Sequence, residues 1–484
     1  MQLKTIRLSI MRNKFATFAL LFLAVFALSS CLGNDDDEYT YTDDTVITAF
    51  SVSGGKQYVY LKTSTGKDSL VIQSPTLSSY KFYIDQLKGE IYNPDSLPCG
   101  VDPKKLVCSV STGYSSNVVI KSVTSDSIFY FSTSDSVDFS TERQLLAYSM
   151  STKSVRKYKV RVNIHKEQPD SFAWHAKANC DELKRLTAVK AVALKNCLLL
   201  FGTNGTQTIA FAHDGTNWTQ CTFNFNHTLA ADAYKGVVAK NGNAFISDGG
   251  DIMTSADGSE WTLVAKATGV ERLVAATPFS LYGYAADGSM MASTDNGQTW
   301  TASALDDAIT LLPTQETAYV SVPLKTNAMT DHVLLIGSRD HSIYPGDKNL
   351  TIWGKIDEGA EGSDNQPWAY YNITEDMKYA APMLNDIHAL PYDSAVYLLG
   401  SANGNIVPTL YKSRDNGITW KADTLVAMPE DFVEGVNLND NTTAYAMTVD
   451  RENRLWIVNA KNGKTWCGRI NRLGWARRQT AFTK

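Results

Sequence analysis

A short motif that recurs through the second half of the chain constrains its fold more than any other feature. It reads S-T-D-N-G-Q-T-W at Ser293–Trp300 and S-R-D-N-G-I-T-W at Ser413–Trp420. Degraded copies read S-A-D-G-S-E-W at Ser255–Trp261 and H-D-G-T-N-W at His213–Trp218. A turn motif repeated about every 40 to 55 residues marks one supersecondary unit per copy. The sequence therefore predicts a repeat architecture.

Each position of the motif has a structural role. An aspartate carboxylate can accept hydrogen bonds from nearby backbone N–H groups and hold a turn closed, and a glycine tolerates the left-handed backbone of such a turn. The following tryptophan supplies an apolar face for the next strand. The residues assigned these roles are Asp214, Asp257, Asp295, Gly297, Trp300, Asp415, Gly417 and Trp420. The motif resembles the Asp-box of sialidases, sortilin-type receptors and other β-propellers, where it lies away from the ligand, so it indicates architecture rather than activity.

Short apolar runs separated by tight turns fill residues 169–484, as expected for the blades of a β-propeller. The tryptophans that would close a blade predict six blades, at Trp218, Trp261, Trp300, Trp368, Trp420 and Trp475. Trp174 leaves two alternatives open: it closes a seventh blade, or it belongs to an N-terminal strand that completes the ring.

Residues 45–168 alternate apolar and polar side chains in short runs, such as Y-V-Y-L at Tyr58–Leu61 and Y-K-V-R-V-N-I at Tyr158–Ile164. Turn residues separate the runs, and helical periodicity is absent. This pattern predicts an antiparallel β-sandwich of immunoglobulin-like type. The expected fold class is thus all-β, with the sandwich preceding the propeller.

The N-terminus has the pattern of an export signal. Four basic residues precede an apolar run at Phe18–Leu28, and L-S-S-C follows, ending at Cys31. Residues 1–30 are therefore predicted to be a secretory signal, too short to remain a membrane span. L-S-S-C resembles a bacterial lipobox, which implies cleavage before Cys31 and a lipid on its thiol, so that the protein is held to a membrane by lipid.

Residues 31–44 form an acidic tether that contains L-G-N-D-D-D-E. This cluster resembles the surface-export signal of Bacteroidetes lipoproteins, and the other interpretation is a solvated linker. The chain has a net charge of −5, although its signal segment is basic. A net acidic body argues against binding to nucleic acid.

The cysteines show no metal-binding or redox spacing. Cys99 and Cys108 flank a turn-rich segment, and a disulfide between them is plausible in an oxidising compartment. The remaining ones are scattered and none has C-x-x-C spacing, so the sequence predicts no metal and no cofactor.

The fourth repeat is longer than the others, because 67 residues separate Trp300 from Trp368. Long insertions in repeats usually form loops, and loops often bind ligands. The segment supplies five candidate ligand-binding residues that combine aromatic and charged groups: Arg339, Tyr344, Trp353, Tyr370 and Tyr371. The alternative is that these aromatic residues belong to the core of an irregular blade.

Catalytic signatures are missing from the sequence. There is no H-E-x-x-H, no G-x-S-x-G and no R-I-P tripeptide of the sialidases. No catalytic residue is assigned, and a binding role is favoured over an enzymatic one. The leading hypothesis is a lipid-anchored binding protein whose propeller recognises a glycan, a peptide or another envelope protein. A propeller glycoside hydrolase or lyase is the first alternative, and an envelope assembly scaffold is the second.

The whole chain resembles a family of uncharacterised Bacteroidetes lipoproteins that is known only as a domain of unknown function. The resemblance rests on I-Y-N-P-D-S-L-P-C-G at Ile91–Gly100, D-S-V-D-F-S at Asp135–Ser140 and P-D-S-F-A-W at Pro169–Trp174. It implies a place in the cell envelope, on the outer membrane and facing outward, and it transfers no catalytic residues. Ligand identity, oligomeric state and the use of Asp-Ser or Asp-Thr sites for glycosylation stay open.

Overall fold

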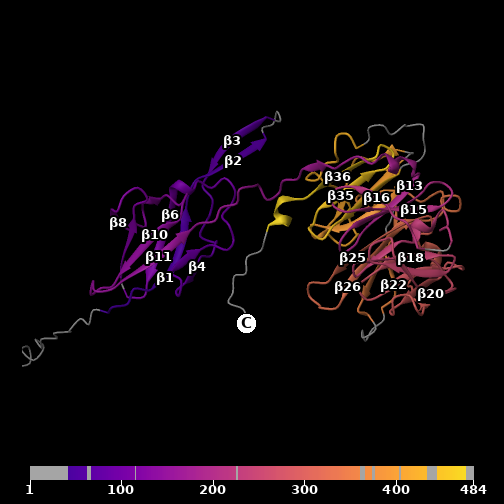
Figure 1. Ribbon diagram of the computed structural model, residues 1–484, viewed down its shortest axis with the longest axis horizontal. Helices are drawn as coiled ribbons and strands as arrows, with labels where there is room; N and C mark the ends of the chain where they lie inside the picture. Colours follow the sequence, from indigo (N-terminus) through magenta and orange to yellow (C-terminus); the bar gives the residue numbers. More distant parts are fainter. Residues whose placement is uncertain are drawn as a thin grey trace, which may run out of the picture. The chain divides into compact units, whose positions relative to one another are not determined.

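A computed structural model describes residues 42–62, 67–114, 116–224, 227–359, 366–372, 377–402, 405–432 and 444–475. The chain divides into two compact units between Lys166 and Glu167, and the regular structure of both is almost entirely β (Figure 1). The predicted signal, Cys31 and the acidic residues that follow it lie outside the described residues. Within the described chain, no helix is both long enough and apolar enough to span a membrane.

Two sheets form the first unit, in the orders β1-β6-β9 and β4-β5-β11-β10-β7-β8. Their strands are β1 (Ile47–Gly54), β4 (Tyr83–Asp85), β5 (Glu90–Tyr92), β6 (Leu106–Thr112), β7 (Asn117–Lys121), β8 (Ile128–Tyr130), β9 (Ser136–Val137), β10 (Arg143–Tyr148) and β11 (Val155–Arg161), with a 3-10 helix η1 at Pro103–Lys105. A separate hairpin joins β2 (Gln57–Lys62) to β3 (Asp68–Gln73). The expectation of a purely antiparallel sandwich is wrong at one place, because β5 pairs with β11 in parallel.

The core of the sandwich lies between the two sheets. Phe50 and Val52 of β1 and Leu106 and Cys108 of β6 are buried at alternate positions. They pack against Leu145 and Tyr158 of the larger sheet. This is the result expected when a strand alternates apolar and polar side chains and only one face is covered.

The predicted Cys99–Cys108 disulfide is wrong, because both cysteines are free thiols in the structure. The Cys108 side chain is fully buried in the core, which raises the pKa of its thiol to about 12. Cys99 lies in the turn before η1, where its carbonyl accepts a hydrogen bond from Gln57. Proximity in the sequence did not bring the two sulfurs together, because β6 directs Cys108 inward.

Six sheets form the second unit, each a blade of a propeller. The first three blades comprise β13 (Ala188–Ala193), β14 (Leu198–Thr203), β15 (Thr208–His213) and β16 (Trp218–Gln220); β17 (Val238–Lys240), β18 (Asn243–Asp248), β19 (Asp251–Ser255) and β20 (Trp261–Ala265); and β21 (Val270–Ala276), β22 (Leu281–Ala285), β23 (Met290–Ser293) and β24 (Thr301–Ala302).

The last three blades comprise β25 (Glu316–Pro323), β26 (Asp331–Ser338), β27 (Thr351–Asp357) and β28 (Ala369–Tyr370); β29 (Asn385–Tyr392), β30 (Ala395–Ala402), β31 (Asn405–Ile406), β32 (Tyr411–Ser413) and β33 (Lys421–Ala422); and β34 (Tyr445–Val449), β35 (Leu455–Asn459) and β36 (Lys464–Gly468) with β12 (Trp174–Ala176). Among the described residues, the 3-10 helices η2 (Asp181–Arg185), η3 (Ala233–Gly236) and η4 (Ile309–Leu311) connect strands, and η6 (Asn471–Gly474) follows β36.

The ring is closed by its N-terminal strand. β12 pairs antiparallel with β36, placing Trp174 opposite Gly468, and the Trp174 indole donates to the carbonyl of Ala427. The assignment of Trp475 as the tryptophan that closes the sixth blade is therefore wrong, since β12 with Trp174 is the outer strand of that blade and Trp475 comes after η6. The described residues form six blades, and Trp174 belongs to the ring-closing strand rather than to a seventh.

The two complete copies of the motif fold into identical corners. The Ser293 hydroxyl donates to Asp295 at 2.8 Å and accepts from the Gly297 N–H at 2.8 Å. Asp295 also accepts from both the backbone and the hydroxyl of Thr299, and the Trp300 indole donates to the Gly297 carbonyl at 3.1 Å. The corner at Ser413–Trp420 repeats all five bonds.

Positive φ angles of 94° at Gly297 and 92° at Gly417 explain why glycine occupies that position. The degraded copies keep part of the geometry. Asp257 accepts from two backbone N–H groups, and the Trp261 indole donates to the Gly258 carbonyl. In the first blade the imidazole of His213 replaces the serine as acceptor.

We expect Asp295→Ala to lower the free energy of unfolding by about 1–3 kcal/mol, because it leaves the donors of the corner without an acceptor. Although partial burial opposes ionisation, hydrogen bonds from Thr299 and Ser293 lower the pKa of Asp295 to about 2. The stability that ionised Asp295 adds to the fold is present above the ordinary pKa of 3.8 and disappears as the pH falls toward 2. Denaturant unfolding at pH 7 and pH 3 measures both effects. Gln298→Ala in the same corner is the control, and equal losses for the two variants at pH 7 would contradict the prediction.

The fourth repeat has long connections between its strands, at residues 303–315 and 339–350 among those described. The segments expected to be inserted, Asp331–Tyr344 and Ile352–Tyr371, include the long strands β26 and β27 and the outer strand β28. Trp353 of β27 and Trp368 are both 0 % exposed. The extra length of this repeat therefore lies mostly in its connections, while Trp353 and Trp368 fill the blade.

Candidate functional site

The inner strands of the blades enclose a cavity of about 560 Å³ along the axis of the ring. Strands β13, β25 and β29 line it along most of their length, and parts of the other three blades complete the wall. The wall is uneven, because Tyr319 of β25 reaches past the third blade. Its hydroxyl accepts from the Ala239 N–H at 2.9 Å and donates to the Ala239 carbonyl at 3.2 Å. The cavity is therefore a built feature of the propeller, with one side narrowed by a tyrosine.

Charged side chains from several blades meet where the inner strands begin. Lys190 comes from β13, Glu316 is the first residue of β25, and Asp386 is the second residue of β29. Lys235 lies on η3, and its carbonyl accepts a hydrogen bond from Lys190 Nζ at 2.9 Å. All four residues line the cavity. We call this group, with His388, the channel mouth.

The ionisation of Glu316 is strongly perturbed. Burial, with a further contribution from the nearby Asp386 carboxylate, raises its pKa to about 7. Lys235, the Ile387 N–H and Arg272 oppose this shift but do not cancel it. Glu316 therefore titrates near neutral pH instead of being fully ionised.

The pKa values of Lys190 and His388 are lowered instead. Burial, reinforced by repulsion from Arg272, lowers the pKa of Lys190 to about 7. The pKa of His388 falls to about 4, chiefly through burial, with Asp386 opposing the shift and Lys190 adding to it. Within the described part of the chain, neither Lys190 nor Glu316 has an ion-pair partner within 4 Å. The mouth thus presents a lysine and a carboxyl group that are only partly charged at neutral pH.

The backbone at Asp386 adopts a left-handed conformation. Its φ is 48°, and the pairing of β29 with β30 shifts register between Asn385 and His388. The Asp386 carboxylate accepts from the Ser401 hydroxyl at 2.8 Å, and its carbonyl accepts from the Tyr445 hydroxyl at 2.8 Å. Residues outside the usual backbone regions persist only when their surroundings fix them, and they concentrate at functional sites.

The opposite end of the channel has satisfied polar groups. Lys240 is buried and its Nζ donates to the carbonyl of Phe279 and to Asn296, both at 2.8 Å. Asp357 accepts from Thr277, Ser280 and the Gly359 N–H. These groups use their hydrogen-bonding capacity within the fold, so the mouth with Lys190 and Glu316 is the better candidate site.

The five residues expected to bind a ligand do not line this cavity. Arg339 pairs with Asp347 and lies 3.7 Å over the ring of Tyr344, so its charge is already compensated. Trp353 is fully buried against Tyr370, with ring centroids 5.3 Å apart, and is a core residue rather than a ligand contact. The remaining candidate is Tyr371, whose hydroxyl lies 3.2 Å from His332 Nε2.

The channel-mouth residues were missed by sequence reasoning. The available signal was a charged residue within a short apolar strand, as in A-V-K-A-V-A at Ala188–Ala193 and N-D-I-H-A-L at Asn385–Leu390. Such a strand with one buried face would not place a charge there unless it had a partner or a function. The pattern could have marked individual residues, but not their convergence.

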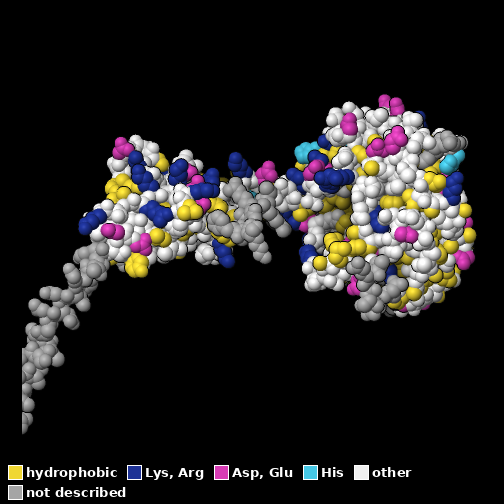
Figure 2. Space-filling model, turned by 60° about the horizontal axis from the view of Figure 1, so that its bottom comes forward, with side chains coloured by type: hydrophobic (Ala, Val, Ile, Leu, Met, Phe, Trp, Pro, Cys, Tyr) yellow, Lys and Arg dark blue, Asp and Glu magenta, His cyan; other side chains and the backbone are white. Residues whose placement is uncertain are grey.

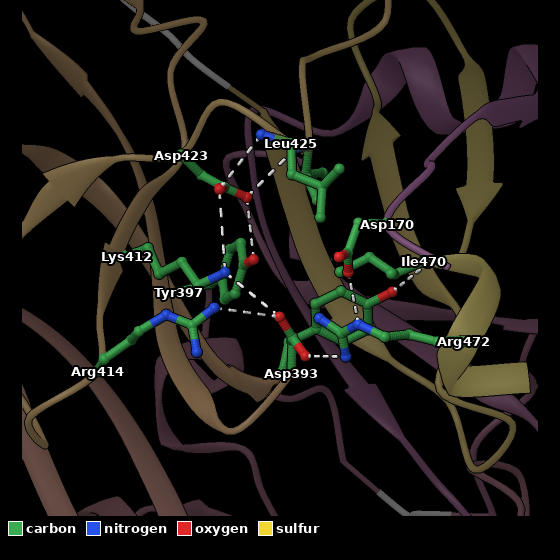
Figure 3. Close-up of polar contacts among 11 residues, drawn as sticks. Asp170, Asp393, Tyr397, Lys412, Arg414, Asp423, Leu425, Ile470 and Arg472 are labelled. Carbon is green, nitrogen blue, oxygen red and sulfur yellow. Dashed lines mark hydrogen bonds and ion pairs between the residues drawn. The ribbon is translucent and has the colours of Figure 1, made fainter. Parts of the chain in front are cut away.

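A second polar cluster is centred on Asp393, in the turn between β29 and β30 of the fifth blade, and its charged groups are paired with one another (Figure 3). Asp393 is surrounded by Lys412 at 3.4 Å, Arg414 at 3.6 Å and Arg472. Arg472 also binds Asp170, at 2.7 Å, in the segment just before β12. This cluster joins the two ends of the propeller chain to a blade, and we call it the closing clamp.

Comparisons with known proteins agree with this fold. The model of the DUF6242 beta propeller domain matches residues 168–478, and that of the DUF6242 N-terminal domain, a domain of unknown function, matches residues 50–162. No curated protein matches the chain.

Solved structures with a similar fold include YCF48 from Cyanidioschyzon merolae, at 14% identity and a TM-score of 0.30, covering 62% of this chain and 99% of that one. Another is a Trichoderma reesei protein of Carbohydrate-Active Enzymes Family AA12, at 13% identity and a TM-score of 0.35, covering 62% of this chain and 96% of that one. A third is PorZ of Porphyromonas gingivalis, described as a surface component of the type-IX secretion system. Its identity is 12% and its TM-score 0.30, and the match covers 87% of this chain and 62% of that one. At these values the likeness says nothing about function.

Proposed function

The chain belongs to the DUF6242 family, and on that basis we propose that it is a lipid-anchored binding protein of the bacterial cell envelope that recognises its ligand at the channel mouth of the propeller. An immunoglobulin-like sandwich serves as the spacer between anchor and propeller. The ligand is polar and small enough to enter the channel, such as the end of a glycan or of a peptide.

The observation that carries this proposal is that Lys190 and Glu316 line the cavity with strongly shifted pKa values. Burial shifts the pKa of each to about 7, toward its uncharged form. Both shifts work against folding at neutral pH. The folded state resists ionising Glu316 as the pH rises from 4.5 to 7, and it resists protonating Lys190 as the pH falls from 10.5 to 7. Side chains that reduce stability but are held in a cavity are typical of binding and catalytic sites.

The cavity suits a small ligand in size and lining. Its volume of about 560 Å³ falls within the range of roughly 300–1,000 Å³ that is usual for ligand sites. A ligand that donates to Glu316 and accepts from Lys190 would restore the charge on both groups. Hydroxyl, amide and carboxylate groups of glycans and peptides can do so.

We expect Lys190→Met and Glu316→Gln to weaken ligand binding by about tenfold or more, since each removes a charged partner in a desolvated site. Each variant should also be more stable than wild type at pH 8, by roughly 1 kcal/mol after allowing for water in the channel. For Glu316→Gln the gain should vanish near pH 4, where the carboxyl group is protonated in both states.

The measurement uses soluble protein with Cys31→Ala, screened on glycan and peptide arrays and then titrated with the best ligand. Lys266→Met, just after the second blade, and Glu271→Gln, in β21 of the third blade, alter exposed side chains and are the matched controls. Normal binding by both channel variants would reject the site. An absence of any ligand would favour the assembly-scaffold alternative.

One observation favours a hydrolase as the second candidate. Glu316, whose pKa of about 7 suits a general acid, lies beside Asp386, and glycoside hydrolases work with two carboxyl groups. Turnover of an array-positive glycan that is lost in both Glu316→Gln and Asp386→Asn would support this alternative. Binding without product would support recognition alone.

The anchoring part of the proposal is tested in cells. Cys31→Ala should move the protein out of the membrane fraction, because the lipid is attached to that thiol. Replacing Asp35, Asp36, Asp37 and Glu38 by alanine should reduce cleavage by added protease on intact cells. Detergent dependence unchanged by Cys31→Ala would reject the lipid anchor, and unchanged cleavage would reject export through the acidic cluster.

A further inference from the structure

Three turns of the sandwich gather around the point where the described chain begins. The turn between β4 and β5 is held there by Gln86, whose side chain donates to the Ile47 carbonyl at 2.7 Å. The turn between β6 and β7 is held by Ser116, which donates to the Asp44 carbonyl at 2.9 Å. The turn between β10 and β11 is held by Ser151, which donates to Asp43. We call this surface the tether end of the sandwich.

Each of these turns carries an apolar side chain that points into solvent. Leu87 is 99% exposed, Tyr114 is 60% exposed and Met150 is 40% exposed. Two exposed lysines, Lys88 and Lys153, stand beside them. Hydrophobic and basic side chains are visible at this end of the sandwich, next to the start of the described chain (Figure 2).

The acidic groups at the tether end are engaged by the protein itself. Asp85 accepts from the backbone N–H groups of Leu87 and Lys88, both at 3.0 Å. Asp44 accepts from the Val46 N–H at 2.9 Å, and Asp43 accepts from Ser151. Lys88 also forms an ion pair with Asp85, with Nζ 3.7 Å from the carboxylate, although its own side chain is 71% exposed. The carboxylates are therefore engaged by the turns and by Lys88, while Lys153 and the apolar side chains remain exposed.

The position of the anchor singles out this end from other exposed apolar surfaces. Ten residues separate Cys31 from Thr42, and a chain of that length spans at most about 40 Å when fully extended. The hairpin of β2 and β3 also exposes apolar groups, such as Tyr60 and Ile72. The hairpin, however, follows the last residue of β1, whereas the tether precedes the first residue of that strand. The hairpin therefore lies at the other end of β1.

We propose that the tether end rests on the membrane surface, with Leu87, Tyr114 and Met150 in the boundary between headgroups and acyl chains and Lys88 and Lys153 on lipid phosphates. This inference rests on the proposed lipid anchor at Cys31. Short apolar tips flanked by lysines suit such a boundary, because the lysine stems lie along the apolar layer while their ammonium groups reach the phosphates.

The contact would fix the orientation of the sandwich. β11 starts at the tether-end turn and ends at Arg161, at the opposite end, where the chain continues to the second unit. A lipid on a flexible tether holds a protein near a membrane but leaves its direction free. Leu87, Tyr114 and Met150 would add a second contact, which fixes the direction of the sandwich relative to the membrane.

The test uses the lipidated full-length protein in vesicles of phosphatidylcholine with a minor share of phosphatidylglycerol, which contain no reactive amines. A membrane-impermeant amine-acylating reagent is added, and labelled lysines are identified by mass spectrometry. Compared with Cys31→Ala protein in solution, labelling of Lys88 and Lys153 should fall about fivefold or more. Lys104 and Lys105, exposed next to the opposite end of β6, should be labelled equally in both samples.

Combining Leu87→Ser, Tyr114→Ser and Met150→Ser should restore the labelling of both lysines while the protein still floats with the vesicles. Tyr60→Ser, Leu70→Ser and Ile72→Ser, which replace exposed apolar side chains of the hairpin, form the matched control and should leave the protection intact. Lysines that react in vesicles as fast as in solution, or protection that survives the triple tether-end substitution, would overturn the contact while leaving the anchor in place. Protein that does not float with vesicles would reject the anchor itself, and with it this resting position.

Discussion

Asp393→Asn should lower the free energy of unfolding by about 3–5 kcal/mol, the cost expected when one partner of a buried ion pair is removed. The Asp393 side chain is 6% exposed and faces Lys412, Arg414 and Arg472. Asparagine preserves the shape and tolerates the left-handed backbone at this position, where φ is 52°. The variant therefore removes the charge alone.

The loss should appear as earlier opening of the ring. Arg472 keeps its bond to Asp170, but it no longer holds the C-terminal segment to the fifth blade. Although burial opposes ionisation, Arg472 and Lys412 lower the pKa of Asp393. Its contribution is therefore present above the ordinary value of 3.8 and is lost as the pH falls through the lowered pKa.

Chemical denaturation of wild type and variant at pH 7 and at pH 3 measures this contribution. The matched control is Arg414→Met, because Arg414 also binds Asp393 but its side chain is 64% exposed. An exposed partner is worth about 1 kcal/mol or less. If the two substitutions cost the same, Asp393 does not act as the centre of the clamp.

Trp353→Ala should also cost about 3–5 kcal/mol, through loss of packing and creation of a cavity. The indole is fully buried in the fourth blade, packs against Tyr370 and donates to the Leu311 carbonyl at 3.0 Å. Its loss leaves that carbonyl without this donor. Thermal unfolding followed by circular dichroism measures the effect, and ligand affinity at low temperature should remain normal.

Tyr344→Ala is the control for this experiment. Tyr344 is a half-buried aromatic residue of the neighbouring loop that covers the Arg339 guanidinium, and such a contact is worth about 0.5–1 kcal/mol at an exposed site. A Trp353→Ala protein with normal melting and lost binding would show that the indole serves a ligand and not the core.

Local chemistry made the corners predictable. In Ser293–Trp300 and Ser413–Trp420, every bond that closes the turn joins residues at most four positions apart. A short peptide therefore contains all the information for its own geometry. Counting the tryptophans expected to close a blade predicted six blades, a number that the sheets confirm, although Trp475 was the wrong residue for the sixth.

Aromatic patterns were less informative. Trp353 and Tyr344 both stood out in the same segment, yet one is fully buried and the other is a half-buried residue over the Arg339 guanidinium. An alternating aromatic residue has the same sequence pattern on either face of a strand. Which face is covered depends on the neighbouring blade and not on the strand itself.

Two features were decided by tertiary structure alone. The strand that closes the ring comes from Trp174 and not from Trp475, because β12 pairs with β36 across almost the whole propeller. The channel mouth likewise joins Lys190, Glu316 and Asp386, which come from three different blades. The sequence by itself determined the repeating unit, since hydrogen bonds within a few residues specify it. The ring determined the site, since only closure brings the starts of distant strands to one mouth and desolvates the charges there.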